Sequence, residues 1–206
     1  MDSIQKLTEL FKQFPGIGPR QAKRFVYFLL GANSSYRNEL IDLIETLKNN
    51  IKICTSCYRF FNQEQPSSLC NICNKKTRDR STLLIVSRDV DLESIEKSGA
   101  YNGLYFVLGG TIPILDKEPE KKVRLNELVR DVSDRIESGG LKEIILGLSA
   151  NPEGEHTGEA ISTRLRDVIN KHNIRISLLG RGLSTGSEIE YSDGDTIEQA
   201  LKNRKN

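Results

Sequence analysis

Much of what this chain lacks already limits what it can do. The 206 residues include no tryptophan, one methionine and only two histidines, and apolar residues make up a modest 37%. No window approaches the roughly 20 apolar residues that a membrane-spanning helix needs. Residues 1–6 show no basic stretch followed by an apolar run, so the pattern of an export leader is absent. We therefore expect a soluble cytoplasmic protein in a reducing compartment.

A strong net charge is also lacking, because 30 Lys and Arg stand against 28 Asp and Glu, which leaves a net charge of +2. The distribution of charge says more than the total. Residues 1–80 hold 13 Lys and Arg and 7 Asp and Glu, a net of +6, and residues 81–206 carry a net of −4. A basic first third suggests an anionic partner for that part of the chain, although a chance fluctuation would look the same.

Cysteine is scarce and confined to one short stretch. Two C-x-x-C pairs, Cys54 with Cys57 and Cys70 with Cys73, are separated by twelve residues. Two residues between thiolates let a tight turn aim both sulfurs at one metal ion, and the loop returns the second pair to the same point. With no coordination position left open, the spacing predicts one structural Zn²⁺ per chain. Two disulfides or a redox pair are the alternatives, which the missing export signal disfavours.

The N-terminal segment has the pattern of two helices joined by a tight turn. Its apolar residues recur at helical spacing: Ile4, Leu7, Leu10, Phe11 and Phe14. Residues 15–18, Pro-Gly-Ile-Gly, then break the helix, and Pro19 suits the first position of a second helix. The pattern is typical of a DNA-binding helix–hairpin–helix motif, and an ordinary pair of helices with a glycine turn is the alternative.

Six residues of this segment are candidate DNA contacts: Gly16, Ile17, Gly18, Arg20, Lys23 and Arg24. The glycines let the backbone approach a phosphate closely, and free amides at the start of the second helix can bind that phosphate. The three cationic side chains add charge toward neighbouring phosphates without reading sequence. We expect Ile17, at the tip, to plug the hairpin rather than to contact a base.

Beyond residue 80, short apolar segments alternate with amphipathic ones. The expected strands are 83–86, 103–108, 143–148 and 174–179, and the expected helices follow residue 89 and span about 125–136 and 159–171. This alternation predicts an α/β unit with a mainly parallel sheet. Sites in such sheets gather at the carboxyl ends of the strands, which here carry Ser87, Gly109–Gly110 and the acidic loop 151–155.

The order of these pieces resembles the RecR family of bacterial recombination mediators. The matching segments are 14–19 (FPGIGP), the four cysteines, 103–110 (GLYFVLGG), 153–157 (EGEHT), 181–186 (RGLSTG) and 188–191 (EIEY). They cover nearly the whole chain in collinear order. The resemblance implies an α+β protein of several parts: a helix–hairpin–helix domain over 1–53, a four-cysteine zinc module over 54–80, a Toprim-like α/β domain over 81–180, and a C-terminal region of a turn-rich segment and helix over 181–206.

This resemblance implies a role in recombinational DNA repair. Members of the family form rings or clamps of two or four subunits, and act with RecO and RecF to load recombinase onto single-stranded DNA. The hairpin serves DNA binding and subunit contacts, and the Toprim domain serves partner binding. By the resemblance, Glu153 and Glu155 are candidate contacts to a basic surface of a partner, with no membrane involved. The alternatives are a partner-binding scaffold with little direct DNA contact and a Mg²⁺-dependent Toprim nuclease.

Departures from the family pattern argue against catalysis. Catalytic Toprim domains bind Mg²⁺ with a Glu after the first strand and an Asp-x-Asp pair after a later one. Here Ser87 stands where family members usually show Glu, Phe106 replaces the usual His, and residues 149–151 hold no Asp pair. Residues 180–182 lack the Lys-Ser/Thr of a phosphate-binding P-loop. We therefore expect a protein that is not an enzyme.

Overall fold

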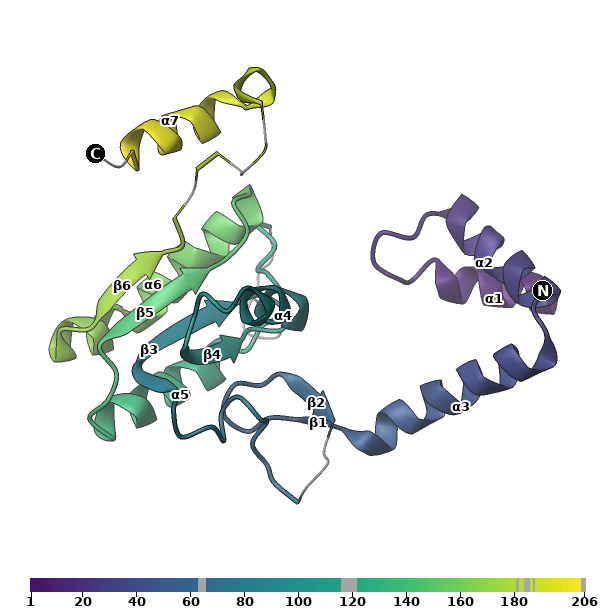
Figure 1. The fold of residues 1–206 in the computed structure, drawn as a ribbon, viewed down its shortest axis with the longest axis horizontal. Coiled ribbons are helices and arrows are strands. Elements are labelled where there is room, and N and C mark those ends of the chain that lie inside the picture. The colour runs from purple at the N-terminus through teal and green to yellow at the C-terminus, as the bar shows by residue number, and fades with distance from the viewer. Residues whose placement is uncertain (63–65, 116–121, 181, 184–185, 187, 205–206) are drawn as a thin grey trace. The chain divides into compact units, whose positions relative to one another are not determined.

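The structure is a computed structural model that describes residues 1–62, 66–115, 122–180, 182–183, 186 and 188–204. Its contacts divide the chain into two compact units, Met1–Ile51 and Lys52–Asn206 (Figure 1). None of the described helices is long and apolar enough to span a membrane. The finer division into parts over 54–80, 81–180 and 181–206 stays a prediction.

Three helices make up the first unit: α1 (Ser3–Phe11), α2 (Pro19–Gly31) and α3 (Ser34–Asn50). Local capping fixes where two of them begin. The Asp2 carboxylate accepts a hydrogen bond from the main-chain amide of Gln5 at 2.8 Å. The side-chain oxygen of Gln5 in turn accepts one from the main-chain amide of Asp2, and the two bonds form a capping box. The Asn33 side chain caps α3 in the same sense, by accepting from the amide of Tyr36 at 2.7 Å.

The core of this unit is small. Among its described residues only Ala22 and Val26 are buried, where α1 packs against α2. Many large apolar side chains of α2 and α3 are exposed instead: Phe25, Tyr27, Phe28, Leu30, Tyr36, Ile41, Leu43, Ile44 and Leu47. Exposed apolar residues gathered to this extent mark an interaction surface.

The second unit is built on a four-stranded sheet. Its strands are β3 (Asp79–Val86), β4 (Gly103–Val107), β5 (Glu143–Gly147) and β6 (Arg175–Leu178). Their order is β4-β3-β5-β6 and every neighbouring pair is parallel. Because Val86 of the central β3 lies opposite Val107 and Gly147, the carboxyl ends of three strands meet at one edge. The expected α+β class with a mainly parallel sheet is confirmed.

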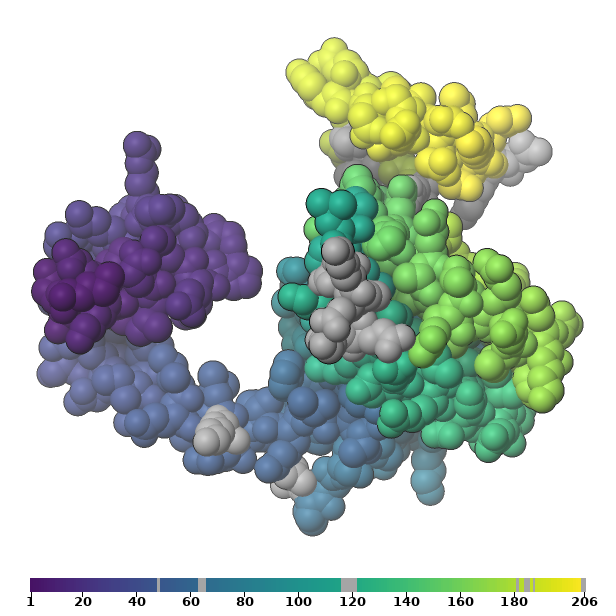
Figure 2. Space-filling view, turned by 180° about the vertical axis from the view of Figure 1, so that it is seen from behind, coloured from purple at the N-terminus to yellow at the C-terminus, as the bar shows by residue number. Residues whose placement is uncertain are grey.

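Different helices cover the two faces of this sheet. On one face, α5 (Leu125–Glu137) and α6 (Pro152–His172) pack against alternate strand residues such as Ile85, Phe106 and Ile144. Both helices, in green, lie at the surface in the view from behind (Figure 2). On the other face, α4 (Asp89–Ser98) and the segment that holds the four cysteines, called here the cysteine segment, pack against the intervening strand residues. Val86 and Val107 are among these residues. Because successive side chains of a strand point to opposite faces of the sheet, each buried strand contributes alternate residues to the two cores.

Four shorter elements flank this sheet in the sequence. Strands β1 (Ile51–Ile53) and β2 (Phe60–Asn62) pair in a two-stranded sheet beside the cysteines. After β6, a 3₁₀ turn, η2 (Ile189–Tyr191), precedes α7 (Gly194–Lys202). The Asp193 side chain caps α7 by accepting from the amide of Thr196 at 2.8 Å. The described part of the C-terminal region thus consists of turns and one helix.

A half-buried polar network connects Arg78, just before β3, to α4 and β4. The Arg78 guanidinium pairs with the Glu96 carboxylate and donates to the carbonyls of Tyr101 at 3.4 Å and Gly103 at 3.3 Å. The Tyr105 hydroxyl donates to the same carboxylate at 2.7 Å. Burial alone would raise the pKa of Glu96, but hydrogen bonds from Arg78 and Tyr105 outweigh it and hold this pKa below its ordinary value.

We expect Glu96→Gln to destabilise the second unit by about 1–2 kcal/mol near neutral pH, because the amide loses the charge-assisted bonds to Arg78. A lowered folded-state pKa means that this stabilisation is present above the ordinary carboxyl pKa and is lost as the pH falls through the folded value. Urea unfolding should therefore show a difference between variant and parent at neutral pH that shrinks below about pH 4. Glu93→Gln on the exposed side of α4 is the control. An equal difference at both pH values would contradict the charge-based account.

Candidate functional site

The backbone of the hairpin is open to a ligand. Gly16 has a φ of +76°, in the left-handed region that favours glycine. An added Cβ at Gly16 or Gly18 would meet no atom within 4 Å, so solvent reaches the main chain at both positions. The Ile17 main-chain amide donates to the carbonyl of Phe14 at 3.1 Å, and Ile17 is half-buried.

Helix α2 starts directly at this turn. Gly18 is its N-cap and Pro19 its first residue, so the main-chain amides of Arg20 and Gln21 have no partner within the helix, and the first intrahelical bond runs from the Ala22 amide to the Gly18 carbonyl. The side chains of Arg20, Lys23 and Arg24 are all exposed. Since an α-helix advances by about 100° per residue, these three cations fall within an arc of about 100°. The structure therefore brings the predicted hairpin and the predicted cations onto one surface of the first unit.

The four cysteines meet at one buried point of the second unit. Cys54, Cys57, Cys70 and Cys73 are at most 5% exposed, and their sulfur atoms all lie within 4.8 Å of one another. The sulfurs of Cys57 and Cys70 are 3.6 Å apart. A tetrahedral site with metal–sulfur distances of about 2.3 Å has edges of about 3.8 Å. The cysteines are free rather than paired in disulfides, and they can hold one metal ion.

The electrostatics of the cluster also suit a cation. Hydrogen bonds from Cys57, and then from Cys70 and Cys73, lower the pKa of the Cys54 thiol. The bond to Cys54 raises the pKa of Cys57. Crowded sulfurs that cannot all ionise alone become thiolates together when a divalent cation neutralises them. The Cys70 amide donates to the Cys54 sulfur at 3.3 Å and supports the thiolate form.

The cysteine segment is joined to the sheet by main-chain bonding. The Val107 amide of β4 donates to the carbonyl of Cys57 at 2.8 Å. The first C-x-x-C pair, Cys54 and Cys57 with the two residues between them, is called here the first knuckle, and this bond joins it to the outer edge of β4. On either side, the Phe60 amide donates to Asp89 of α4 at 2.8 Å, and Arg135 of α5 donates to the Ser56 hydroxyl at 3.0 Å. These bonds to three elements fix the orientation of the segment on the sheet.

Tyr58 strengthens this joint and was not singled out from the sequence. It follows the first knuckle with a φ of +61°, which is uncommon outside glycine. This conformation places its ring 5.1 Å from that of the fully buried Phe106, and the Arg124 guanidinium lies 5.7 Å from the Tyr58 ring centroid. Phe106 thus serves as a packing surface for the cysteine segment. No sequence signal short of the fold marks Tyr58 as its partner.

At the carboxyl edge of the sheet, the positions after β3 and β5 where a catalytic Toprim domain holds carboxylates carry Ser87 and Asn151. Ser87, directly after β3, is 4% exposed, and its hydroxyl has no hydrogen-bond partner among the described residues. Asn151, after β5, is the N-cap of α6 and accepts from the Gly154 amide at 2.8 Å. In the described part of the chain, the four cysteines are the only group of three or more side chains suited to hold a metal ion. The residues at this edge therefore do not fit a Mg²⁺ site of the Toprim type.

Glu153 and Glu155 both lie in the first turn of α6 and are exposed. The Glu153 carboxylate accepts from the Thr111 hydroxyl at 3.0 Å. Thr157 joins the same contact, since its hydroxyl donates to the Glu153 carbonyl at 2.6 Å and accepts from the Ile112 amide at 2.9 Å. These bonds fasten the segment after β4 to the start of α6, beside the carboxyl edge of the sheet.

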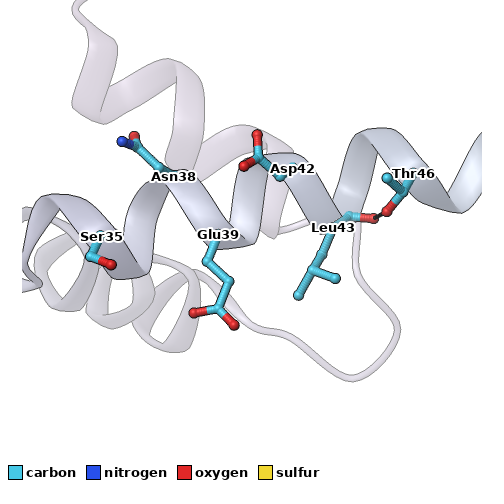
Figure 3. Close-up of a pocket in the computed structure, with 6 residues that line it drawn as sticks. All are labelled: Ser35, Asn38, Glu39, Asp42, Leu43 and Thr46. Atoms are coloured by element: carbon cyan, nitrogen blue, oxygen red, sulfur yellow. Dashed lines mark hydrogen bonds between the residues drawn. The ribbon is translucent and has the colours of Figure 1, made fainter.

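A shallow concavity of about 470 Å³ runs along α3. Figure 3 shows its lining residues, all from this one helix: Ser35, Asn38, Glu39, Asp42, Leu43 and Thr46. A ligand pocket usually encloses most of its ligand between several elements. A concavity lined by a single helix suits a contact with a macromolecule better than chemistry on a small molecule.

Comparison with known proteins agrees with this arrangement of parts. Family models match residues 4–48 (RecR, helix-hairpin-helix), 81–179 (Toprim domain) and 182–205 (RecR, C-terminal). The chain is 33% identical over 205 residues to Recombination protein RecR of Paenarthrobacter aurescens, with 99% of this chain and 96% of the relative covered. The chain belongs to the RecR family. Its similarity to the RecR of Bifidobacterium animalis is 35% over 204 residues, and to that of Brachyspira hyodysenteriae 32% over 204 residues, again with 96% of each relative covered.

Membership of the RecR family confirms the helix–hairpin–helix and Toprim assignments made from the sequence. It places the chain among recombination proteins. The clustering of the four cysteines in the structure supports the expected metal-binding module. The roles of individual side chains at the hairpin and at α6 stay predictions.

We expect Cys54→Ser to reduce bound metal from about one ion per chain to near none, because three sulfurs and a hydroxyl hold a soft cation poorly. Elemental analysis of the purified protein measures this directly. Proteolysis should also become faster within residues 54–80, since the metal supplies the folding free energy of such a segment. Ser56→Ala, in the same knuckle, is the control and should keep the metal. Full metal content in Cys54→Ser would refute the ligand set.

Proposed function

We propose that this RecR family member is a DNA-binding recombination mediator without enzymatic activity, which acts in recombinational repair by helping to load recombinase onto single-stranded or gapped DNA. The observation that carries the proposal is the exposed cationic face of α2, which begins at the open hairpin. Backbone amides at a helix start and nearby cations bind phosphates without regard to sequence. A mediator that acts wherever DNA is damaged requires binding of this kind.

We propose further that copies of the chain assemble into a ring or clamp of two or four subunits through the first unit. A groove of about 600 Å³ in this unit is lined by Phe11, Phe14, Gln21, Arg24, Phe25, Phe28, Leu29, Tyr36, Leu40 and Ile44. So many aromatic and aliphatic residues around an open groove favour burial against another copy. A ring would also raise the effective concentration of weak DNA contacts and so strengthen them together.

We infer that the ion of the cysteine cluster is a structural Zn²⁺, one per chain. The inference is supported by the all-sulfur donor set, its burial and its near-tetrahedral spacing. When bound, the ion supplies no catalytic chemistry, because four thiolates leave no position for water. Its part is to hold the two knuckles together so that the Cys57 carbonyl stays paired with β4.

The second unit is proposed as the surface for RecO and RecF, in the cytoplasm and away from membranes. Glu153 and Glu155 stand exposed at the start of α6, on a segment fastened to the sheet. Carboxylates held on a rigid element can recognise a basic partner surface. A pure scaffold would rely on this surface alone, and the exposed cations of α2 favour direct DNA contact as well.

Replacing Arg20, Lys23 and Arg24 together by Gln should weaken binding to every DNA sequence. The plot of log affinity against log salt should also become shallower by up to about 2 to 3 units, because fewer counterions are released. Fluorescence anisotropy over a range of salt concentrations measures both effects. The control removes three exposed lysines of the second unit, Lys97, Lys142 and Lys171. An unchanged salt slope in the α2 variant would refute the assignment of this face.

Incubation with labelled gapped DNA and Mg²⁺ separates a mediator from a nuclease. We expect a retarded band on a native gel and strands of unchanged length on a denaturing gel, since Ser87 and Asn151 supply no carboxylate for a metal-assisted reaction. Shortened strands would contradict the non-enzymatic proposal. A native gel with no retarded band would instead favour the scaffold, which reaches DNA only through its partners.

A further inference from the structure

One aromatic side chain stands in the middle of the cationic face of α2. With about 100° of rotation per residue, Tyr27 falls between Lys23 on one side and Arg20 and Arg24 on the other. Its side chain is 54% exposed, and the Lys23 ammonium lies 6.0 Å from the centre of its ring. The buried stripe of α2 lies on a different side of the helix, so Tyr27 is not part of the core.

The neighbouring aromatic residues of α2 are placed differently. Phe25 packs edge-to-face with Phe11, with ring centres 5.9 Å apart. Phe28 packs in the same way with Tyr36, at 5.7 Å. Both rings thus contribute to packing within the first unit, whereas Tyr27 presents its ring beside a cation. An exposed ring flanked by positive charges is the combination that binds unpaired nucleic-acid bases.

We propose that Tyr27 is a base-stacking platform for single-stranded DNA, while Arg20, Lys23 and Arg24 hold the phosphates on either side of it. This inference rests on the proposed function, because it takes the α2 face as the DNA-binding surface. Within a duplex, the bases cover each other's faces, so only an unpaired strand can offer a base to the ring. Phosphate contacts alone would not favour the unpaired form, because a duplex carries the higher density of phosphate charge.

Tyr27 therefore decides which form of DNA this face prefers. The cations attract any nucleic acid to α2, and the ring adds affinity only where a base is free. Stacking is tolerant of sequence because every base has a π-face. The platform would give the chain a preference for single strands and gaps without a sequence preference.

The test compares the full-length protein with its Tyr27→Ala and Tyr27→Phe variants by fluorescence anisotropy. Three labelled DNAs of about 30 nucleotides, longer than one stacking site, are used: an oligothymidine strand, a duplex, and a strand of abasic sites with the same phosphates. Tyr191→Ala is the matched control, since Tyr191 is 81% exposed in the second unit. Circular dichroism confirms that each variant is folded.

We expect Tyr27→Ala to weaken binding to the oligothymidine strand by about fivefold or more, and Tyr27→Phe and Tyr191→Ala to leave it unchanged. Binding of Tyr27→Ala to the duplex and to the abasic strand should stay within about twofold of the parent protein, with the same salt slope, because the phosphate contacts remain. This pattern would separate base stacking from charge.

Two results would overturn the platform alone. One is that Tyr27→Ala weakens binding to all three DNAs equally, or weakens binding to none of them. The other needs no variant: a parent protein that binds the abasic strand as tightly as oligothymidine makes no use of bases. A parent protein that binds none of the three DNAs would overturn the proposed DNA binding itself, and the platform with it.

Discussion

The hydrogen bond from the Val107 amide to the Cys57 carbonyl is the constraint on which much of the second unit depends. It satisfies the Val107 amide on the outer edge of β4, a main-chain group that would otherwise be unpaired. It also sets the metal knuckle in line with the sheet, so that Tyr58 reaches Phe106 on one face while the cysteines pack against Val86 on the other. The metal cluster and the sheet are therefore one packed structure, and loss of the ion would disturb the edge of the sheet as well as the knuckles.

The two units differ in how much of their surface is buried. The first buries only two side chains among its described residues and exposes an aromatic groove and a cationic helix face. Such a unit has little core of its own to stabilise it, which suits a role in which partners and DNA supply further contacts. The second has two buried cores, and at the carboxyl edge of its sheet the Ser87 hydroxyl has no hydrogen-bond partner among the described residues.

The chain retains the Toprim fold, and the absence of the strand-end carboxylates supports the proposal of a platform without enzymatic activity. The strand ends at which a catalytic relative would hold Mg²⁺ carry Ser87 and the capping residue Asn151. Glu153, the nearest acidic residue after β5, accepts a hydrogen bond from Thr111 and so helps to hold the segment after β4. A side chain used in this way stabilises the surface around it, and this surface is what partners would recognise.

The sequence by itself determined the elements whose signals are local. Cysteine spacing predicted the metal cluster, Pro and Gly predicted the hairpin, and runs of apolar residues predicted the parallel strands, because each depends on residues close together in the chain. Only the tertiary structure decided that Tyr58 meets Phe106, that Arg78 meets Glu96 and Tyr105, and that α5 and α6 share one face of the sheet. These contacts join residues far apart in the chain, and their geometry follows from strand order and register, which no local pattern encodes.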